Sequence, residues 1–229
     1  MSKGRPAPAI EGLIVSCQAR PGSPLRGPAV MSGMAQAAVR GGARGIRANG
    51  PDDIRAIRAV VDVPVIGISK SSDRGPGKVY ITPTAEAAAQ VAQAGADVIA
   101  IDGTGRPRPG GGTLRDLIQR IHSDWSLLVM ADVDAVDTGI RAREAGADLV
   151  ATTLSGYTEK TADVHPDGPD LALVEELAAK LDCPVIAEGR YKTPDQMKAA
   201  LSAGAVAVVI GTAITNPEAI TRTFTELPG

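Results

Sequence analysis

Aromatic side chains are scarce in this sequence, at 2% of its 229 residues. Proteins that bind single-stranded nucleic acid without sequence preference stack bases on aromatic rings, so the scarcity disfavours that class. The net charge is −2 and no basic block stands out, which disfavours duplex binding through a general electrostatic attraction. Apolar residues nevertheless make up 44% of the chain, so a core can be built from Ala, Val, Ile and Leu.

Cysteine and histidine are also rare, with two of each. Cys17 and Cys183 adjoin apolar runs, which is typical of small, reduced, buried side chains. His122 and His165 lie far apart without metal-ligand spacing, so we expect no metal site. No apolar stretch is long enough for a membrane span, and the first residues contain no apolar secretory segment. We therefore expect a soluble, cytoplasmic protein with no nucleic-acid or membrane partner and a flexible N-terminal segment over residues 1–9.

Eight short apolar runs alternate with helical patterns along the chain. The runs are rich in β-branched residues, which is typical of strands buried on both faces. They begin near Leu13, Gly45, Pro64, Asp97, Ser126, Asp148, Pro184 and Val206. A Gly-Ala pair precedes every second run, and each glycine is suited to end a helix in the left-handed conformation. Helix-start signals lie between runs, including Thr193-Pro194-Asp195-Gln196 and the segments 49–52 and 215–218.

Eight strand–helix units in one chain predict a single (β/α)8 TIM barrel spanning residues 1–229. The alternative is an open, doubly wound sheet, which usually carries a glycine fingerprint after its first strand. Here the first run ends in Ser16-Cys17-Gln18, without that fingerprint. Residues 155–170 are rich in Gly, Thr, Asp and Pro, and they predict a long loop over the active face.

Polar or titratable residues stand at the ends of most of the eight runs. The carboxyl ends of barrel strands converge on one mouth, where barrel enzymes place their active sites. The run ends are Gln18, Arg47, Lys70, Asp102, Asp132, Thr152 with Thr153, Glu188 and Gly211. Together they predict a polar site at this mouth.

Four of these residues each allow a structural and a functional interpretation. Lys70 is either a solvated cation at a strand end or a lysine acting as a base or a Schiff-base former. Glu188 is either a partner for Arg190 or a second proton donor. Arg47 and Asp132 form either a structural ion pair or a pair that orients substrate hydroxyls and polarises a carbonyl.

The last two run ends suggest a phosphate site. Gly189-Arg190 follows the seventh run, and Gly211-Thr212 follows the eighth and opens a short helix. Glycine lets the backbone approach an anion, and a helix N-terminus directs N–H groups at it. Barrels often bind phosphate between these two loops. The alternative is ordinary glycine turns.

Six sequence strings, in order from about residue 12 to residue 220, resemble the N-acetylmannosamine-6-phosphate 2-epimerase family. The strings are residues 12–18, 66–70, 101–109, 152–158, 185–190 and 211–215. The resemblance implies a phosphate-binding (β/α)8 barrel. It also implies interconversion of N-acetylmannosamine 6-phosphate and N-acetylglucosamine 6-phosphate in sialic acid breakdown, without metal or other cofactor, by a protein that often self-associates.

The resemblance also implies a role for each matched residue. Lys70 matches the lysine that removes or returns the proton at C2, and Glu188 matches the carboxylate that works from the other side. Gln18, Arg47 and Asp132 match residues that hold and polarise the sugar. Two acid–base groups on opposite faces let the proton leave one face and return to the other.

One position departs from the family pattern. The last string usually continues into an arginine that helps to bind the phosphate, and this chain has Asn216 there. Such a contact is worth about 1.5–3 kcal/mol, and Arg190 is the residue we expect to compensate. Two alternative functions remain: a class I aldolase that uses Lys70 as its Schiff-base residue, and a non-catalytic barrel that binds phosphosugars.

Overall fold

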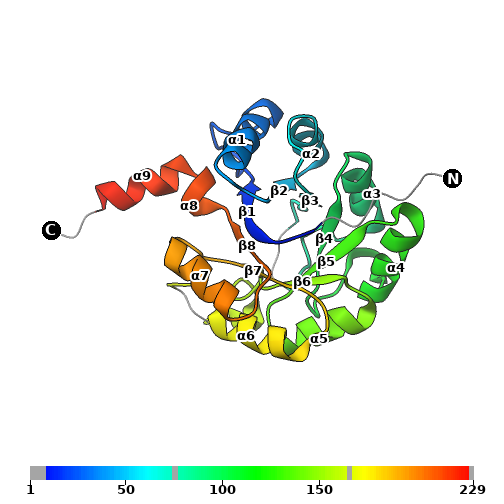
Figure 1. Cartoon of the computed structure of the whole chain (residues 1–229). Helices are drawn as coiled ribbons and strands as arrows, with labels where there is room; N and C mark the ends of the chain where they lie inside the picture. Colours follow the sequence, from blue (N-terminus) through cyan, green and yellow to red (C-terminus); the bar gives the residue numbers. More distant parts are fainter. Residues whose placement is uncertain (1–8, 74–76, 164–166, 227–229) are drawn as a thin grey trace.

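The structure is a computed structural model that describes residues 9–73, 77–163 and 167–226. Within these residues, eight parallel strands pair in chain order into a closed barrel, with helices around it (Figure 1). The strands are β1 (Gly12–Cys17), β2 (Gly45–Asn49), β3 (Val65–Ile68), β4 (Val98–Asp102), β5 (Leu128–Asp132), β6 (Leu149–Ala151), β7 (Val185–Glu188) and β8 (Ala207–Ile210). The predicted TIM barrel is confirmed, and the open sheet is wrong. Except for Ala9, the predicted flexible segment 1–9 lies outside the described residues.

The helices begin and end close to the predicted signals. They are α1 (Pro28–Arg40), α2 (Pro51–Arg58), α3 (Ala85–Gln93), α4 (Leu114–Trp125), α5 (Val136–Ala145), α6 (Leu171–Lys180), α7 (Pro194–Ser202), α8 (Thr212–Thr215) and α9 (Pro217–Thr225). Two short 3-10 turns, Pro109–Gly111 and Glu159–Thr161, lie in the loops after β4 and β6. Thr193 caps α7 through the predicted capping box with Gln196. At α2, however, the cap is Gly50, and Asn49 is the last residue of β2.

Alternate residues of each strand face two different cores. Strand residues such as Ile14, Ile66 and Met130 pack with one another inside the barrel. Their neighbours, such as Ile46 and Val129, pack against the helices outside it. Full burial of such a side chain contributes about 1.5–3 kcal/mol, so the alternation fixes which residues point into the barrel. The same alternation decides which polar residues reach its mouth.

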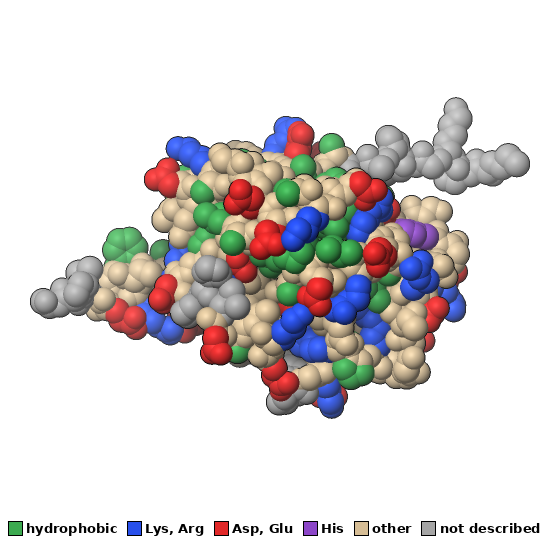
Figure 2. Space-filling view, turned by 90° about the horizontal axis from the view of Figure 1, so that it is seen from below, with side chains coloured by type: hydrophobic (Ala, Val, Ile, Leu, Met, Phe, Trp, Pro, Cys, Tyr) green, Lys and Arg blue, Asp and Glu red, His purple; other side chains and the backbone are tan. Residues whose placement is uncertain are grey.

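The C-terminal helix stands apart from this packing. Figure 1 shows α9 extending away from the barrel, and none of its residues is buried. Phe224, on α9, is 72% exposed. Figure 2 shows the mixed charges of one face of the molecule, with acidic and basic side chains interspersed. None of the described helices combines the length and apolar character that a membrane span requires.

The rare residues have local roles. Cys17 and Cys183 are both free; Cys17 is fully buried, and burial raises the pKa of its thiol to about 12. Cys183 is half-buried and packs against the core outside the barrel, so the prediction of two reduced, buried cysteines is met fully by Cys17 and in part by Cys183. His122 lies 2.8 Å from Asp148 through Nε2, while His165 lies outside the described residues. Among the residues placed by the structure, no cluster of His, Cys, Asp or Glu could hold a metal ion.

Candidate active site

The predicted mouth residues occupy the inward-facing positions of their strands. Gln18 continues the inward series of Ile14, and Asp132 continues that of Met130. Glu188 lies two residues after the inward-facing Ile186, at the end of β7. Because inward positions recur every second residue, polar residues at strand ends meet at one end of the barrel. The pattern read from the sequence therefore marks the inner rim of the mouth.

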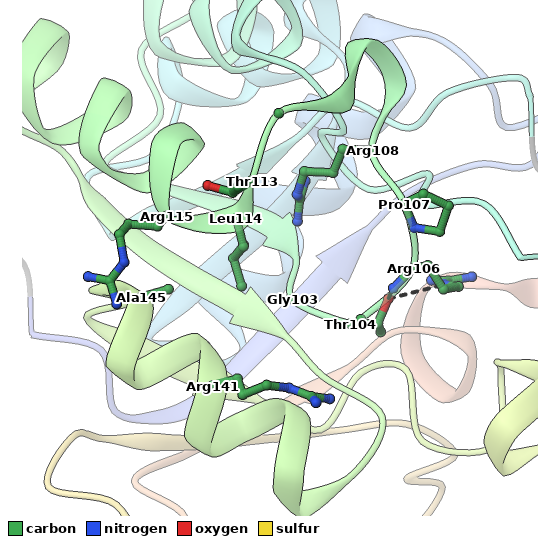
Figure 3. Close-up of a pocket in the computed structure, with 12 residues that line it drawn as sticks. Gly103, Thr104, Arg106, Pro107, Arg108, Thr113, Leu114, Arg115, Arg141 and Ala145 are labelled. Carbon is green, nitrogen blue, oxygen red and sulfur yellow. Dashed lines mark hydrogen bonds between the residues drawn. The ribbon is translucent and has the colours of Figure 1, made fainter.

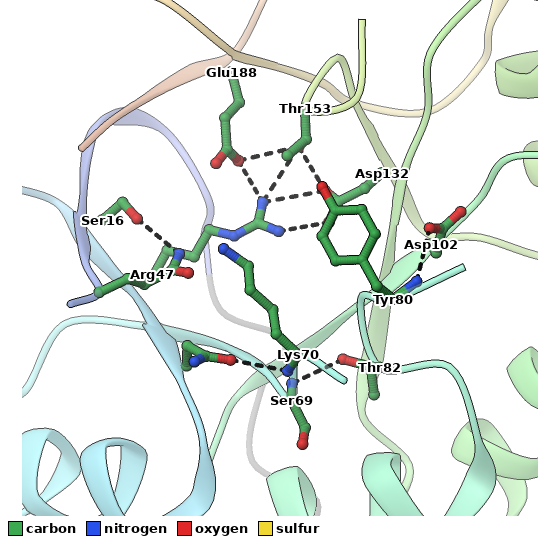
Figure 4. A network of polar contacts seen from close by, with 12 residues as sticks. Ser16, Arg47, Ser69, Lys70, Tyr80, Thr82, Asp102, Asp132, Thr153 and Glu188 are labelled. Carbon is green, nitrogen blue, oxygen red and sulfur yellow. Dashed lines mark hydrogen bonds and ion pairs between the residues drawn. The ribbon is translucent and has the colours of Figure 1, made fainter. Parts of the chain in front are cut away.

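Lys70 and Glu188 approach each other from opposite sides of the barrel. Their strands, β3 and β7, are four apart in a closed ring of eight, which places them across from one another. Lys70 lies just beyond the end of β3 at Ile68 and forms an isolated bridge with Ile81. Figure 4 shows the Lys70 side chain extending towards the Arg47 guanidinium, with Glu188 on the far side of it.

Arg47 links two carboxylates below the mouth. Its Nη2 donates to Asp132 Oδ2 at 2.5 Å. Its Nη1 donates to Asp132 Oδ1 at 3.1 Å and also donates to Glu188 Oε2. The Thr153 hydroxyl donates to Asp132 Oδ1 at 2.6 Å and lies 3.1 Å from Glu188 Oε2. The contacts of the Glu188 carboxylate with Arg47 and Thr153 run to Oε2. Arg47 and Thr153 therefore fix this carboxylate through one oxygen.

The network is buried, and burial decides its electrostatics. The Arg47 and Asp132 side chains are 1% and 0% exposed, and the Glu188 side chain is 15% exposed. Burial alone would lower the pKa of Arg47, but the charges of Asp132 and Glu188 outweigh it and raise that pKa above its ordinary value. Burial raises the pKa of Glu188, and Arg47 offsets this only in part because Asp132 adds a like charge. A carboxyl whose pKa is raised in this way is a better proton donor than an ordinary glutamic acid side chain held ionised.

The raised pKa of Glu188 predicts a pH-dependent stability. Between its ordinary pKa of 4.5 and the raised value, the folded protein binds more protons than the unfolded chain. This contribution to stability is fully present below pH 4.5 and is lost as the pH rises through the raised value. A glutamine at position 188 cannot ionise. The melting temperature of Glu188→Gln should therefore increase relative to that of wild type as the pH rises through this window. Thermal denaturation of both proteins from pH 4 upward measures this, and a constant difference would contradict it.

Gln18 reaches the mouth from β1. Its Nε2 donates to Ser16 Oγ at 2.8 Å. Its Oε1 is buried and accepts no hydrogen bond within the described part of the chain. A buried acceptor left without a donor costs about 1–3 kcal/mol. A substrate hydroxyl or amide at this point would remove that cost.

Arg190 serves the neighbouring loop. Its Nε donates to the Gly168 carbonyl at 2.6 Å and its Nη1 donates to the Ser155 carbonyl at 2.7 Å. The guanidinium also lies 5.2 Å from the centre of the Tyr157 ring. The backbone positions suit a close loop, because Gly189 has φ 117° and Arg190 has φ 60°, both in the left-handed region. The side chain is therefore committed to the long loop after β6, and its predicted contact with the substrate or its phosphate stays a prediction.

The second predicted phosphate loop lies after β8. Gly211 precedes α8, and Thr212 is its first residue and is exposed. A Cβ on Gly211 would lie 3.2 Å from Ser16 Cβ, so this position is tight for any larger residue. Asn216 caps α9, with its Oδ1 accepting the Ala219 N–H at 3.1 Å. The residue that replaces the family arginine thus has a structural use.

Three polar residues near the mouth make contacts that the sequence did not assign to them. Thr153 joins the Arg47 network, and Asn49 accepts the backbone N–H of Lys70 at 2.9 Å. Asp102 is fully buried and binds Arg106 Nη2 at 2.6 Å. Burial raises the pKa of Asp102 above its ordinary value. Thr153 and Asp102 were already among the predicted polar run ends, whereas Asn49, the last residue of β2, was noted only as part of a helix start.

A hollow lies between the loop after β4 and the helices α4 and α5. It has a volume of about 300 Å³, and Figure 3 shows arginine side chains around it. Arg106 faces Asp102, and Arg108 Nη2 donates to the Asp102 carbonyl. Arg115 donates to the Glu144 carbonyl at 2.6 Å and Arg141 pairs with Asp137 at 2.9 Å. The first two contacts hold the loop after β4 to the end of its own strand, and the Arg115 contact links α4 to α5.

The fold and the mouth together define a (β/α)8-barrel protein with a buried arginine–carboxylate network at the carboxyl ends of its strands. The sequence profile of the family described as NanE, "Putative N-acetylmannosamine-6-phosphate epimerase", matches residues 31–227. The chain belongs to this family.

Individual relatives agree with the family match. Proteins of Cutibacterium acnes and Caldanaerobacter subterraneus, each named "Putative N-acetylmannosamine-6-phosphate 2-epimerase", are 52% and 51% identical to this chain. Both alignments cover 93% of this chain, and they cover 92% and 89% of the relatives. The solved N-acetylmannosamine-6-phosphate 2-epimerase of Clostridium perfringens is 42% identical, with a TM-score of 0.89 over 94% of this chain and 92% of that one. The resemblance expected from the six strings is therefore confirmed.

Proposed function

We propose that this protein is an isomerase that interconverts N-acetylmannosamine 6-phosphate and N-acetylglucosamine 6-phosphate by moving a proton at C2. The substrate is the one for which the relatives are named. The observation that carries the proposal is the opposition of Lys70 and Glu188 across the mouth, on the sides of β3 and β7. An acid–base group on each face of a carbon lets a proton leave one face and another arrive on the opposite face.

The chemistry requires the open-chain sugar, whose C1 aldehyde acidifies the C2–H bond. One of the two groups takes the C2 proton, and the electrons of that bond move into an enolate shared with the C1 oxygen. The other group then donates a proton to the opposite face of C2, and the aldehyde re-forms. The two groups end with exchanged protonation states, which exchange with solvent restores. In the reverse direction Lys70 and Glu188 swap roles.

Each group has a defined place in this scheme. The contacts of Arg47 and Thr153 with Glu188 run to Oε2, so we assign proton transfer to Oε1. Because Arg47 and Asp132 are almost fully buried, our proposal gives them the task of holding and tuning Glu188. Direct contact of either residue with the sugar stays a prediction. Gln18 Oε1 is the acceptor that we assign to a substrate hydroxyl or amide.

We place the phosphate of the substrate at the loops after β7 and β8, near Gly189, Arg190, Gly211 and Thr212. Support comes from the left-handed φ of Gly189, and from the tight approach of Gly211 to Ser16. Asn216 supplies no positive charge there, because it is neutral and caps α9. We therefore expect a phosphate site that relies on backbone N–H groups more than on an arginine.

Proton NMR in deuterated water tests the proposal on two substrates. With N-acetylmannosamine 6-phosphate, the wild-type protein should form the C2 epimer and replace the C2 proton by deuterium. With unphosphorylated N-acetylmannosamine, kcat/KM should be lower by roughly tenfold to hundredfold or more, since charge-assisted phosphate contacts are lost. No epimer from either sugar would overturn the proposed function. Equal rates on both sugars would overturn only the assigned phosphate site.

The cellular location and the partners of the protein follow from the same proposal. We propose a cytoplasmic enzyme of amino-sugar breakdown that acts on a small phosphosugar, self-associates, and needs neither nucleic acid nor a membrane surface. The interspersed charges visible on the face in Figure 2 are compatible with this. Sedimentation of the purified protein tests the self-association.

A further inference from the structure

Lys70 is held by a segment that enters the barrel between two strands. β4 pairs with β5 over five residues, from Val98 to Asp102, but it pairs with β3 over only two. Beside the end of β4, the chain returns through residues 79–82, and the Asp102 N–H donates to the Ile81 carbonyl at 2.9 Å. On its other side Ile81 forms an antiparallel bridge with Lys70. The barrel is therefore extended at the mouth by residues 79–82.

The hydrogen-bond pattern of this bridge turns the Lys70 backbone towards β2. The Ser71 N–H donates to the Tyr80 carbonyl at 2.8 Å, and the Thr82 N–H donates to the Ser69 carbonyl at 2.9 Å. Lys70 and Ile81 are thus the non-hydrogen-bonded pair of an antiparallel ladder, whose own N–H groups point away from each other. The Lys70 N–H points to the opposite side and donates to Asn49 Oδ1 at 2.9 Å.

The acceptor of the Lys70 N–H is the Asn49 side chain, because β2 ends at this residue. The Gly50 N–H still donates to the Ile68 carbonyl at 2.8 Å, and Gly50 then caps α2 as the chain turns away. Asn49 faces inward on the same strand as Arg47, about 6.6 Å further along at roughly 3.3 Å per residue. Arg47 binds Glu188, and Asn49 binds the backbone of Lys70. One strand thus holds both opposed groups.

Thr82 holds the neighbouring position from the returning segment. It is fully buried and has φ 43°, a left-handed conformation that is unusual for a β-branched residue. Its Oγ1 accepts the Ser69 N–H at 3.1 Å, while its own N–H donates to Ser69. Strained backbone of this kind persists where the surroundings determine it, and it gathers at functional sites.

We propose that Asn49 and Thr82 are positioning residues that fix the backbone of Lys70, so that its amine reaches the substrate opposite Glu188. The role of Lys70 rests on the proposed function, whereas the two hydrogen bonds do not. A misplacement of about 1 Å at a reacting group can cost roughly 100-fold in rate. The two residues therefore affect kcat without touching the sugar.

Matched variants separate positioning from general stability. Asn49→Ala removes the acceptor for Lys70, and Asn49→Asp keeps an oxygen in the same place. Thr82→Val keeps the branched shape but removes the acceptor for Ser69, and Thr82→Ser keeps it. We expect Asn49→Ala and Thr82→Val to lower kcat by about 10- to 100-fold with KM little changed. Their conservative partners should stay within a few-fold of wild type. Thr113→Ala, which removes the cap of α4, serves as a control that should leave kcat unchanged.

A second readout is independent of activity. Amide hydrogen exchange at Lys70, followed by NMR, should be about 2- to 10-fold faster in Asn49→Ala than in wild type. If wild type epimerises the sugar but Asn49→Ala and Thr82→Val match its kcat, the positioning roles are wrong. If Asn49→Asp is as slow as Asn49→Ala, or Lys70 exchange is unchanged, the inference is also overturned. If wild type itself lacks activity, the proposed function fails, and the exchange experiment still decides whether Asn49 holds Lys70.

Discussion

Lys70→Ala should lower kcat for epimerisation by about 10²–10⁴-fold and slow deuterium exchange on the face of C2 that Lys70 serves to the same extent. Lys70 extends from the side of β3 towards the opposite wall, where Glu188 stands. If each face of C2 has its own acid–base group, removal of one stops proton transfer at that face. Transfer at the other face then cannot complete an inversion. Epimer formation and solvent exchange, followed by proton NMR, measure both steps.

The Lys70 variant should stay folded, because the truncated side chain lies at the mouth and not in either core. Its melting temperature and far-UV circular dichroism provide the control. Wild-type rates in this variant would remove Lys70 from the mechanism. Stable labelling of Lys70 by substrate and borohydride would favour the aldolase-type alternative, in which the lysine forms a Schiff base.

Arg47→Met should be the most destabilising single change at the site, and it should also inactivate the protein. Arg47 is 1% exposed and is the cation between Asp132 and Glu188. Its loss leaves two carboxylates in a buried site, and breaking such a pair costs about 3–5 kcal/mol. For a protein of this size, 1 kcal/mol shifts the melting temperature by about 2–4 °C, so the expected fall is roughly 6–20 °C. Thermal denaturation at neutral pH measures it.

Arg55→Met is the matched control for this change. Arg55 pairs with Asp52 at 3.0 Å, but its side chain is 62% exposed. Exposed pairs contribute about 0–1 kcal/mol, so this variant should melt within a few degrees of wild type. Equal losses in the two variants would contradict the view that the Arg47 network is a buried, desolvated structure.

Much of the barrel and its rim could be predicted because the rules involved are local. Alternation along a buried strand and a polar residue at its end are visible in a few neighbouring residues, as at Asp132 and Glu188. The capping box at Thr193 is equally local, and it is confirmed. These features need no knowledge of what lies across the barrel.

The parts that were missed depend on contacts between distant segments. Asn49 belongs to a helix-start pattern in the sequence, but its side chain serves Lys70, 21 residues away. Thr153, which follows β6, contacts Asp132 at the end of β5 and Glu188 at the end of β7. Arg190 was assigned to the phosphate, and its guanidinium is engaged by carbonyls of the loop after β6. Such pairings depend on the register between strands and on the path of the loops, which cannot be read from a single sequence.

The central claim, two acid–base groups on opposite faces of C2, is tested most directly by the label in the first product formed. N-acetylmannosamine 6-phosphate carrying ordinary hydrogen at C2 is incubated with the wild-type protein in deuterated water, and the epimer is analysed at initial rate by proton NMR. We expect deuterium at C2 in essentially every new product molecule, because the donating group carries a deuteron drawn from solvent. Product that keeps the hydrogen of the substrate would show that one group serves both faces and would contradict it.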